Sequence, residues 1–556
     1  MHSLLWRDAR PPHEQLAAVN DAATDDLELE YLSVWIAGGR ADKQRYIRDA
    51  LMHPPRDAAL IRWRAAITED LMQSPRSCDG LESAARELRR LAQHRPERFP
   101  PEVSKATRIG ARLVELESYV SALHALAAAL TAPTLTAEAF RRLREDVQEA
   151  LRSPGMEALQ ETLPRLRDSL NRAHSITIGI NVSPALEPES AVLIGFSDAE
   201  AQPAAGVMGL VSGPDTVRKG LVRLFRREPV DWFGTDHLAQ GVRALLDAVA
   251  APVERALSAY RSVGAQGVAH LEDEILLMTG AARMAREWHA RGMPWCTASI
   301  VERGAKAWMA QDAFHPVLMA KRQSQEKVVL NDLTFGRTGA VWILTGPNRG
   351  GKTTYLRTAA LIQLLGQNGL PVPAKSAALW AADAIYTHFP VAEAGEPGQG
   401  RLDEEAKRMA RIFQKCTADS LVLLNEVLAG TSAPEGVALA IDILRGFRAL
   451  GCNVIYATHL HDLAARTQEM NDTVKGNSEI GNLTVTSETR SYAGAIVRHP
   501  TYRVIAGQPQ GPTFFASEIA ARHGITLHQI MDSINQRGLG NALAGQDASG
   551  SGDPSS

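Results

Sequence analysis

One segment, Gly346 to Thr354, constrains the fold of this chain more than any other. It reads Gly-Pro-Asn-Arg-Gly-Gly-Lys-Thr-Thr and fits the pattern G-x-x-x-x-G-K-[ST]. The apolar residues 340–345 before it are typical of a strand, and residues 355–365 after it are typical of a helix. In this setting the glycines let backbone N–H groups close around phosphate oxygens, and the helix N-terminus adds a partial positive charge. The combination favours a nucleotide site over a chance glycine-rich turn.

This phosphate loop implies ATP and Mg²⁺ as ligands. Lys352 can reach the β and γ phosphates, and the Thr353 hydroxyl can ligate Mg²⁺. The predicted nucleotide-binding residues are Gly346, Pro347, Asn348, Arg349, Gly350, Gly351, Lys352, Thr353 and Thr354.

A second buried-type strand, residues 421–425, ends in Asn425 and is followed by Glu426. In nucleotide hydrolases of this layout, an acidic pair at such a strand end handles Mg²⁺ and the attacking water. Glu426 is therefore the predicted general base or water-orienting group. Asn425 is the predicted second metal-site residue, but an amide brings no negative charge to Mg²⁺, so slow turnover is expected.

A third strand-like segment, residues 453–458, is followed by His459. A side chain at this strand end could sense the γ-phosphate, so His459 joins Glu426 as a predicted catalytic residue. The alternative is a histidine with only a structural role.

Composition sets limits on the other functions. A length of 556 residues predicts two or more domains, and 45% hydrophobic with 22% charged residues is ordinary for a soluble globular protein. The net charge of −3 means that any nucleic-acid contact must come from local basic faces. Four scattered cysteines indicate neither a disulfide framework nor a zinc site, and neither a signal peptide nor a membrane helix is predicted. A reducing cytoplasm is the expected location.

The secondary structure expected along the chain changes twice. Residues from about 10 to 170 read as helices, most clearly residues 105–130, where apolar residues recur every three or four positions. Residues 175–182 and 191–196 are strand-like, and residues 271–289 return to helix. From about residue 301 to 530, strands alternate with helices as in a parallel α/β sheet, with a last strand expected at 502–506.

A basic cluster follows the first two strands and lies near Phe225, Trp232 and Phe233. A contact with the DNA backbone and a solvated helix face are both open interpretations of it. The cluster consists of Arg218, Lys219, Arg223, Arg226 and Arg227.

Together these pieces resemble the ATPase domain of the MutS family of DNA mismatch-repair proteins. The resemblance rests on TGPNRGGKTTYLR (345–357), LVLLNEVLAGTSAPEGVALA (421–440) and NVIYATHLHDLA (453–464). Weaker matches are FHPVL (314–318), VVLNDL (328–333), TYRVIAGQPQG (501–511) and, in the first half, residues 174–195. The resemblance implies a dimer of ABC-type ATPases that sandwiches nucleotide, with lever helices leading to a clamp around DNA.

The fold class implied is a multidomain protein, with an α-helical core and lever domain, a small β-containing connector and an α/β P-loop NTPase domain of the ABC type. The expected domains are a helical core and lever at 1–174, a β-hairpin with a reduced clamp or connector at 175–265, a returning lever helix at 266–300, the ATPase domain at 301–540 and a disordered tail at 541–556.

Several positions depart from the family pattern. The sequence has no Phe-x-Glu triplet, which is the family's mismatch-reading wedge. Arg349 stands where methionine or threonine is common and adds a cation beside the phosphates. Gly400 falls where a serine would bond the γ-phosphate of the partner subunit, and Arg401 after it is either an arginine finger or a solvent-facing residue. The turn at 434–436 resembles that of a second branch of MutS-like proteins, which carry a C-terminal nuclease domain. No such domain is expected after residue 540, so a nuclease partner would be a separate protein.

Three functions follow from the sequence. The first is a MutS-like ATPase of the mismatch-repair or recombination type, which acts as a homodimer and clamps double-stranded or branched DNA in response to ATP. The second is a nucleotide-binding scaffold with little hydrolysis, because Asn425 and Gly400 weaken the catalytic set. The third is an ABC-type ATPase that acts on ribosomes or RNA.

Overall fold

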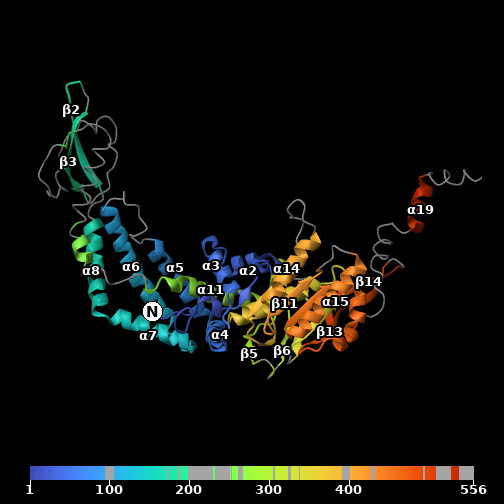
Figure 1. The fold of residues 1–556 in the computed structure, drawn as a ribbon. Coiled ribbons are helices and arrows are strands. Elements are labelled where there is room, and N and C mark those ends of the chain that lie inside the picture. Colours follow the sequence, from blue (N-terminus) through green and yellow to red (C-terminus); the bar gives the residue numbers. More distant parts are fainter. Residues whose placement is uncertain are drawn as a thin grey trace, which may run out of the picture. The chain divides into compact units, whose positions relative to one another are not determined.

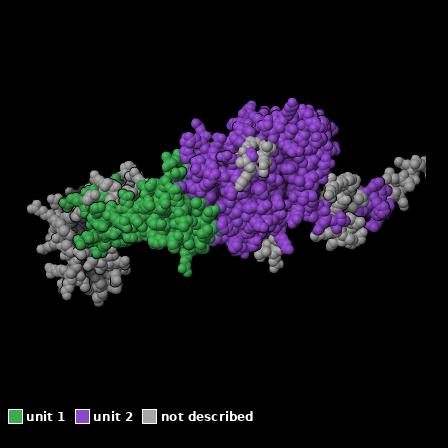
Figure 2. All heavy atoms as spheres, turned by 90° about the horizontal axis from the view of Figure 1, so that it is seen from below, with its two compact units in different colours: residues 1–10, 66–282 green, residues 11–65, 283–556 purple. Residues whose placement is uncertain are grey.

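The structure is a computed structural model that divides into two compact units, coloured separately in Figure 2. Unit 1 contains residues 1–10 and 66–282, and unit 2 contains residues 11–65 and 283–556. The residues described are 1–93, 105–171, 175–185, 188–197, 230–231, 251, 253–258, 260, 267–302, 304, 307–322, 327–336, 339–390, 401–427, 432–492, 495–508 and 527–537.

The main sheet of unit 2 has the strand order β1-β10-β11-β12-β8-β13-β14. All pairs from β1 to β13 are parallel, and only β13 and β14 pair antiparallel. The strands are β1 (Ala18–Val19), β8 (Ala340–Thr345), β10 (Ala384–His388), β11 (Leu421–Asn425), β12 (Asn453–Thr458), β13 (Glu479–Tyr492) and β14 (Ala495–Ala506). Strands 340–345, 421–425 and 453–458 are confirmed to the residue, and the expected strand 502–506 is the end of the longer β14.

Helices cover both faces of this sheet (Figure 1), which is why its central strands are continuously apolar. Helix α13 (Lys352–Gln367) is almost completely buried, including its polar Gln363 and Gln367, and packs against β11 and β12. On the other face, α14 (Arg401–Lys415) and α15 (Ala433–Leu450) share an apolar core with the strands, and Leu444 and Phe447 are fully buried in it. The remaining helices of this part are α16 (His461–Ala465), α17 (Thr467–Thr473) and α19 (Leu527–Gln536).

An N-terminal segment adds the edge strand β1 to this sheet. The side chain of Asn20, which follows β1, accepts a hydrogen bond from the Thr387 backbone N–H at 2.9 Å and donates one to the Thr387 carbonyl at 2.8 Å. Residues 1–174 were expected to form one helical domain, whereas residues 11–65 group with the main sheet. The segment also contains η1 (His13–Gln15), α1 (Ala23–Asp26), α2 (Leu29–Ile36) and α3 (Ala41–Met52).

A smaller sheet with the order β5-β9-β6-β7 packs beside α13. Its central link is Trp308, which is almost fully buried, packs edge-on against Phe335 and donates a hydrogen bond of 2.6 Å from Nε1 to Gln363 of α13. The elements are β5 (Ser299–Ile300), β6 (Trp308–Ala313), α12 (Pro316–Lys321), β7 (Asn331–Gly336) and β9 (Ser376–Leu379).

Unit 1 is mainly helical. The helix expected at 105–130 is confirmed as α6, and its apolar stripe, which includes Leu116 and Leu123, is buried against α5. The expected strands form an antiparallel hairpin of β2 and β3. The elements are α5 (Pro75–Gln93), α6 (Lys105–Ala129), α7 (Glu138–Arg152), α8 (Pro154–Asn171), β2 (Ser175–Val182), β3 (Pro188–Ser197) and β4 (Val230–Asp231), while α4 (Ala58–Gln73) and α11 (His270–Ala290) have residues in both units.

Among the described helices, none combines the length and the apolarity that a membrane crossing requires. The expected disordered tail at 541–556 lies outside the described residues.

Candidate functional site

The phosphate loop joins β8 to α13 at the carboxyl edge of the main sheet. Gly351 adopts φ +91° directly before α13, and a Cβ atom on Gly346 would lie 2.7 Å from Cβ of Val485. Only glycine adopts the positive φ of Gly351 without strain, and any side chain at Gly346 would clash with Val485. Arg349 also has a positive φ, +61°, which is uncommon for a residue with a side chain. The loop backbone is therefore shaped by its sequence into the turn that phosphate binding needs.

Lys352 is the most buried charged side chain of the loop, with 5% of its surface exposed. Its ammonium donates hydrogen bonds to the carbonyls of Gly346 at 3.0 Å and Pro347 at 3.1 Å, and lies 3.9 Å from Oε1 of Glu426. Burial lowers the pKa of Lys352, while the Glu426 carboxylate raises it. The structure thus brings together the predicted phosphate-binding lysine and the predicted base.

Thr353 and Asn425 form a pair of oxygen ligands beside this lysine. The Thr353 hydroxyl donates to the amide oxygen of Asn425 across 3.5 Å, a long hydrogen bond, and Asn425 is largely buried. Hydroxyl and amide oxygens suit a hard cation, so the two residues fit Mg²⁺. Glu426 follows at φ +49°, and its N–H donates to the Ala457 carbonyl of β12 at 2.8 Å. This backbone bond fixes the strand end that carries both Asn425 and Glu426.

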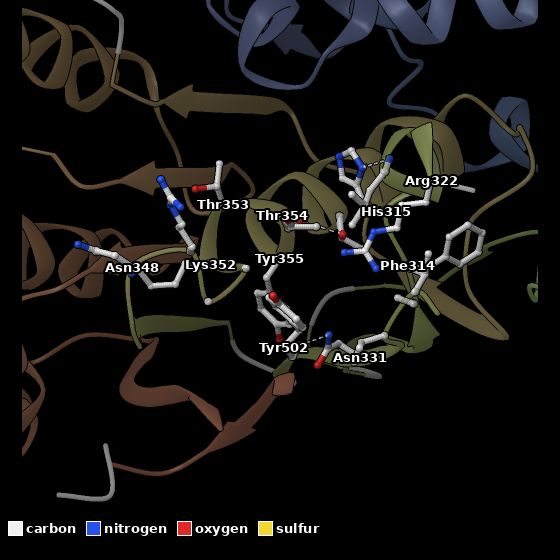
Figure 3. Close-up of a pocket in the computed structure, with 18 of the residues that line it drawn as sticks. Phe314, His315, Arg322, Asn331, Asn348, Lys352, Thr353, Thr354, Tyr355 and Tyr502 are labelled. Carbon is white, nitrogen blue, oxygen red and sulfur yellow. Dashed lines mark hydrogen bonds between the residues drawn. The ribbon is translucent and has the colours of Figure 1, made fainter. Parts of the chain in front are cut away.

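A cavity of about 380 Å³ begins at the phosphate loop, a size within the usual range for small-molecule sites. Lys352 and Asn348 lie at one end of it, and Phe314, His315 and Arg322 lie at the other (Figure 3). Val328, Val329, Asn331, Tyr355 and Tyr502 also line it. The cavity thus joins the cationic phosphate loop to a mixed group of aromatic, apolar and polar side chains.

Tyr502 projects from β14 beside the loop, with Cδ1 of its ring 3.3 Å from the point where a Cβ on Gly351 would lie. Its backbone carbonyl accepts a 3.0 Å hydrogen bond from Asn331, and the same amide accepts one from Val504 at 2.8 Å. The sequence segments around Tyr502 and Asn331 are only weak family matches, and no role was predicted for either residue. Their position depends on the contact between β7 and β14, two strands that are distant in the sequence, so no local pattern encodes it.

Several other predicted site residues either do not line the cavity or lie outside the described residues. His459 is exposed after β12 and does not line the cavity, although its charge, like that of Lys352, acts with burial to lower the pKa of His461. Arg401 is the first residue of α14, and its side chain, like Gly400, lies outside the described part of the chain. The basic cluster Arg218, Lys219, Arg223, Arg226 and Arg227 also lies outside it.

A second cavity of about 1000 Å³ reaches Thr353 and Asn425 from the side of the N-terminal segment. Asp21, Asp25 and Asp26 line it from that segment, and α14 contributes Arg408, Arg411 and Lys415. Burial raises the pKa of the Asp26 carboxyl, and hydrogen bonds with the Thr387 side chain and the Phe389 backbone oppose this shift. This cavity could not be predicted from the sequence, because the N-terminal segment carries no recognisable motif.

Two family models match separate parts of the chain. MutS domain V matches residues 342–499, and the MutS2 N-terminal domain matches residues 56–206. The first range contains the whole phosphate loop, together with Asn425, Glu426 and His459.

Curated relatives agree with these matches. Endonuclease MutS2 of Clostridium perfringens is 32% identical over 223 residues, which make up 40% of this chain and 26% of that protein. DNA mismatch repair protein MutS of Chlorobium phaeobacteroides is 34% identical over 215 residues, or 37% of this chain and 24% of that protein. The chain therefore spans about a quarter of the length of these relatives.

Proposed function

The chain belongs to the MutS family, and from this premise we propose that it is an ATP hydrolase whose nucleotide state controls its hold on double-stranded or branched DNA. One observation carries the proposal: Lys352 and Glu426 lie 3.9 Å apart at the cavity that begins at the phosphate loop. Each is the residue type that its position in a phosphoryl-transfer site requires. A cytoplasmic location remains part of the proposal.

Hydrolysis would start from the contacts that Lys352 now makes. Its ammonium exchanges the Gly346 and Pro347 carbonyls for phosphate oxygens, which leaves the nearby Glu426 carboxylate to face a water. Glu426 orients this water and accepts its proton as the oxygen bonds to the γ-phosphorus and the bond to the β–γ bridging oxygen breaks. Thr353 and Asn425 would hold Mg²⁺, which neutralises charge on the phosphates when it is bound.

The apolar and aromatic side chains of the cavity suit the nucleoside. Tyr502 offers an aromatic ring beside Gly351, and Val328 and Val329 offer apolar surface. We place the base against these side chains, since stacking on an aromatic ring stabilises a base of any kind.

The assembly proposed is a homodimer that encloses the nucleotide between two ATPase domains. Gly400 and Arg401 would then face the partner's γ-phosphate, and His459 would sense the phosphate within its own subunit. The basic cluster at 218–227 is the proposed DNA contact. Because the sequence has no Phe-x-Glu triplet, we do not assign it mismatch reading of the usual kind.

DNA binding by this protein is expected to depend on both ATP and salt. If the basic cluster and its partner copy contact several phosphates, the log–log slope of affinity against salt should be roughly −0.9 per contact. The measurement is a salt titration with duplex and branched DNA, in ATP and without nucleotide. A DNA affinity that does not change with salt in any condition would contradict the clamp. If the affinity falls steeply with salt, the slope should become shallower in the triple variant Arg223→Ala, Arg226→Ala, Arg227→Ala.

Asn425→Asp is expected to strengthen Mg²⁺ binding in the presence of ATP by about tenfold, because it adds a charge next to the Thr353 hydroxyl. The measurement is the Mg²⁺ concentration that gives half-maximal hydrolysis. Asp419→Asn, a change of charge at an exposed residue before β11, is the control and should leave that concentration unchanged. An unaltered Mg²⁺ dependence in Asn425→Asp would remove this residue from the metal site.

The neutral Asn425 also favours a second candidate, a nucleotide-binding scaffold that hydrolyses ATP very slowly. Steady-state phosphate release with and without DNA separates the two. Release that DNA stimulates supports the motor, whereas binding of ATP without release supports the scaffold.

A further inference from the structure

The second cavity brings an acidic segment to the strand end that lacks a negative charge. Asn425 occupies the position beside Thr353 where a carboxylate would assist a dication, and it is neutral. The cavity that reaches both residues is lined on its N-terminal side by Asp21, Asp25 and Asp26. The question is whether one of these carboxylates is fixed close to the metal site.

Helix α13 fixes Asp26 from one direction. Arg357 donates a 2.6 Å hydrogen bond from Nε to the backbone carbonyl of Asp26. Because Arg357 follows Thr353 by four residues in α13, the two residues lie one turn apart on the same face of the helix. The backbone of Asp26 is therefore docked on the turn of α13 that follows Thr353, and both residues line the same cavity.

The sheet fixes Asp26 from the other direction. The Thr387 side chain and the Phe389 backbone hydrogen-bond with Asp26. Thr387 pairs with Leu423 in the parallel register of β10 and β11, and Asn425 lies two residues further along β11. Residues two apart in a strand point to the same face, so Thr387, Leu423 and Asn425 share the face that meets α13.

Asp26 has an oxygen available for such a role. Oδ2 of Asp26 is buried and has no hydrogen-bond partner among the described residues. The charge of Arg357 favours the ionised form of Asp26 by lowering its pKa against the effect of burial, and Arg357 also pairs with Glu28 at 3.7 Å. Glu28 in turn accepts a 2.9 Å hydrogen bond from Lys321. Asp21 and Asp25 are exposed, so their charges are better screened by water.

We propose that Asp26 is a positioning residue for Mg²⁺ and ATP, which supplies through bridging water the negative charge that Asn425 lacks. The proposal rests on the proposed function, since it concerns the same nucleotide site. It explains how a chain with a neutral strand end retains a site for a dication: a carboxylate from the N-terminal segment, distant in sequence, is docked beside it by β1 and by Arg357.

The test measures metal binding rather than turnover. Binding of a fluorescent ATP derivative is titrated with Mg²⁺ in the wild type, in Asp26→Asn and in the matched control Asp25→Asn. Asp26→Asn should raise the Mg²⁺ midpoint about tenfold and leave nucleotide affinity in EDTA within about twofold, because only the metal loses an attraction. Asp25→Asn should shift the midpoint by less than about twofold, since its charge is exposed.

A double-variant comparison separates this role from a structural one. If Asp26 supplies the charge that Asn425 lacks, Asp26→Asn should shift the Mg²⁺ midpoint less in a protein that already carries Asn425→Asp. The expected shift there is under about threefold, since the effects of coupled neighbours are non-additive. Thr387→Val keeps the Asp26 carboxylate but removes a hydroxyl that holds it, so it should raise the Mg²⁺ midpoint by less than Asp26→Asn does. If Asp26→Asn does not fold, the Mg²⁺ midpoint of Thr387→Val tests the proposed role of Asp26.

Three results would overturn the proposal: an unmoved midpoint in Asp26→Asn or Thr387→Val, equal shifts in Asp26→Asn and Asp25→Asn, or an Asp26→Asn shift of the same size in both backgrounds. Absence of nucleotide binding in the wild type at every Mg²⁺ concentration would instead refute the proposed function. The two failures are therefore distinguishable.

Discussion

Glu426→Gln is expected to lower steady-state ATP hydrolysis by at least about a hundredfold, the lower range for loss of a general base. Glutamine keeps the length of the side chain but cannot accept the proton of the attacking water. ATP binding should persist, because the Lys352 ammonium, which lies 3.9 Å from Glu426, loses a competing carboxylate rather than a phosphate contact. If the protein closes as a dimer around ATP, this variant should accumulate in that form.

The measurements are phosphate release under steady-state and single-turnover conditions, ATP affinity, and molecular mass in ATP and Mg²⁺. Glu435→Gln is the matched control, since it makes the same chemical change at an exposed position in the first turn of α15. Hydrolysis at the wild-type rate in Glu426→Gln would show that another group activates the water.

Lys352→Ala is expected to weaken ATP binding by at least about a hundredfold, the equivalent of about 2.7 kcal/mol at 25 °C. The change removes the one buried ammonium of the loop and leaves the Glu426 carboxylate to repel the phosphates without a counter-charge. Titration with ATP in Mg²⁺ measures the loss.

Lys375→Ala provides the control for this variant, because that lysine is 71% exposed and does not line the nucleotide cavity. Melting temperatures without nucleotide are compared in parallel, since Lys352 also donates to two loop carbonyls. ATP affinity within a few-fold of the wild type in Lys352→Ala would contradict the assignment of the loop.

The elements that the sequence predicted are those whose chemistry is local. The phosphate loop has a strand, a glycine turn and a helix in immediate succession, so Gly351 and Lys352 could be placed without knowing the rest of the fold. Asn425 and Glu426 were found because each parallel strand of the sheet ends at the same edge, where polar residues interrupt an apolar run.

The parts that escaped prediction depend on contacts between distant segments. The edge strand β1 has only two residues, too few to show an alternating pattern, and its place is set by pairing with β10 more than 360 residues later. Tyr502 is held at the cavity by the hydrogen bond from Asn331, which lies 171 residues earlier, and Asp26 reaches the second cavity through Arg357. None of these positions follows from residues near them in the chain.

The central claim is that residues 346–354 together with Asn425 and Glu426 enclose one nucleotide in each subunit. Equilibrium dialysis of the wild-type protein against ATP and Mg²⁺ tests it most directly. The account predicts saturable retention that approaches one ATP per chain and is lost in Lys352→Ala. Retention of no ATP by the folded wild type, or equal retention by both proteins, would contradict it.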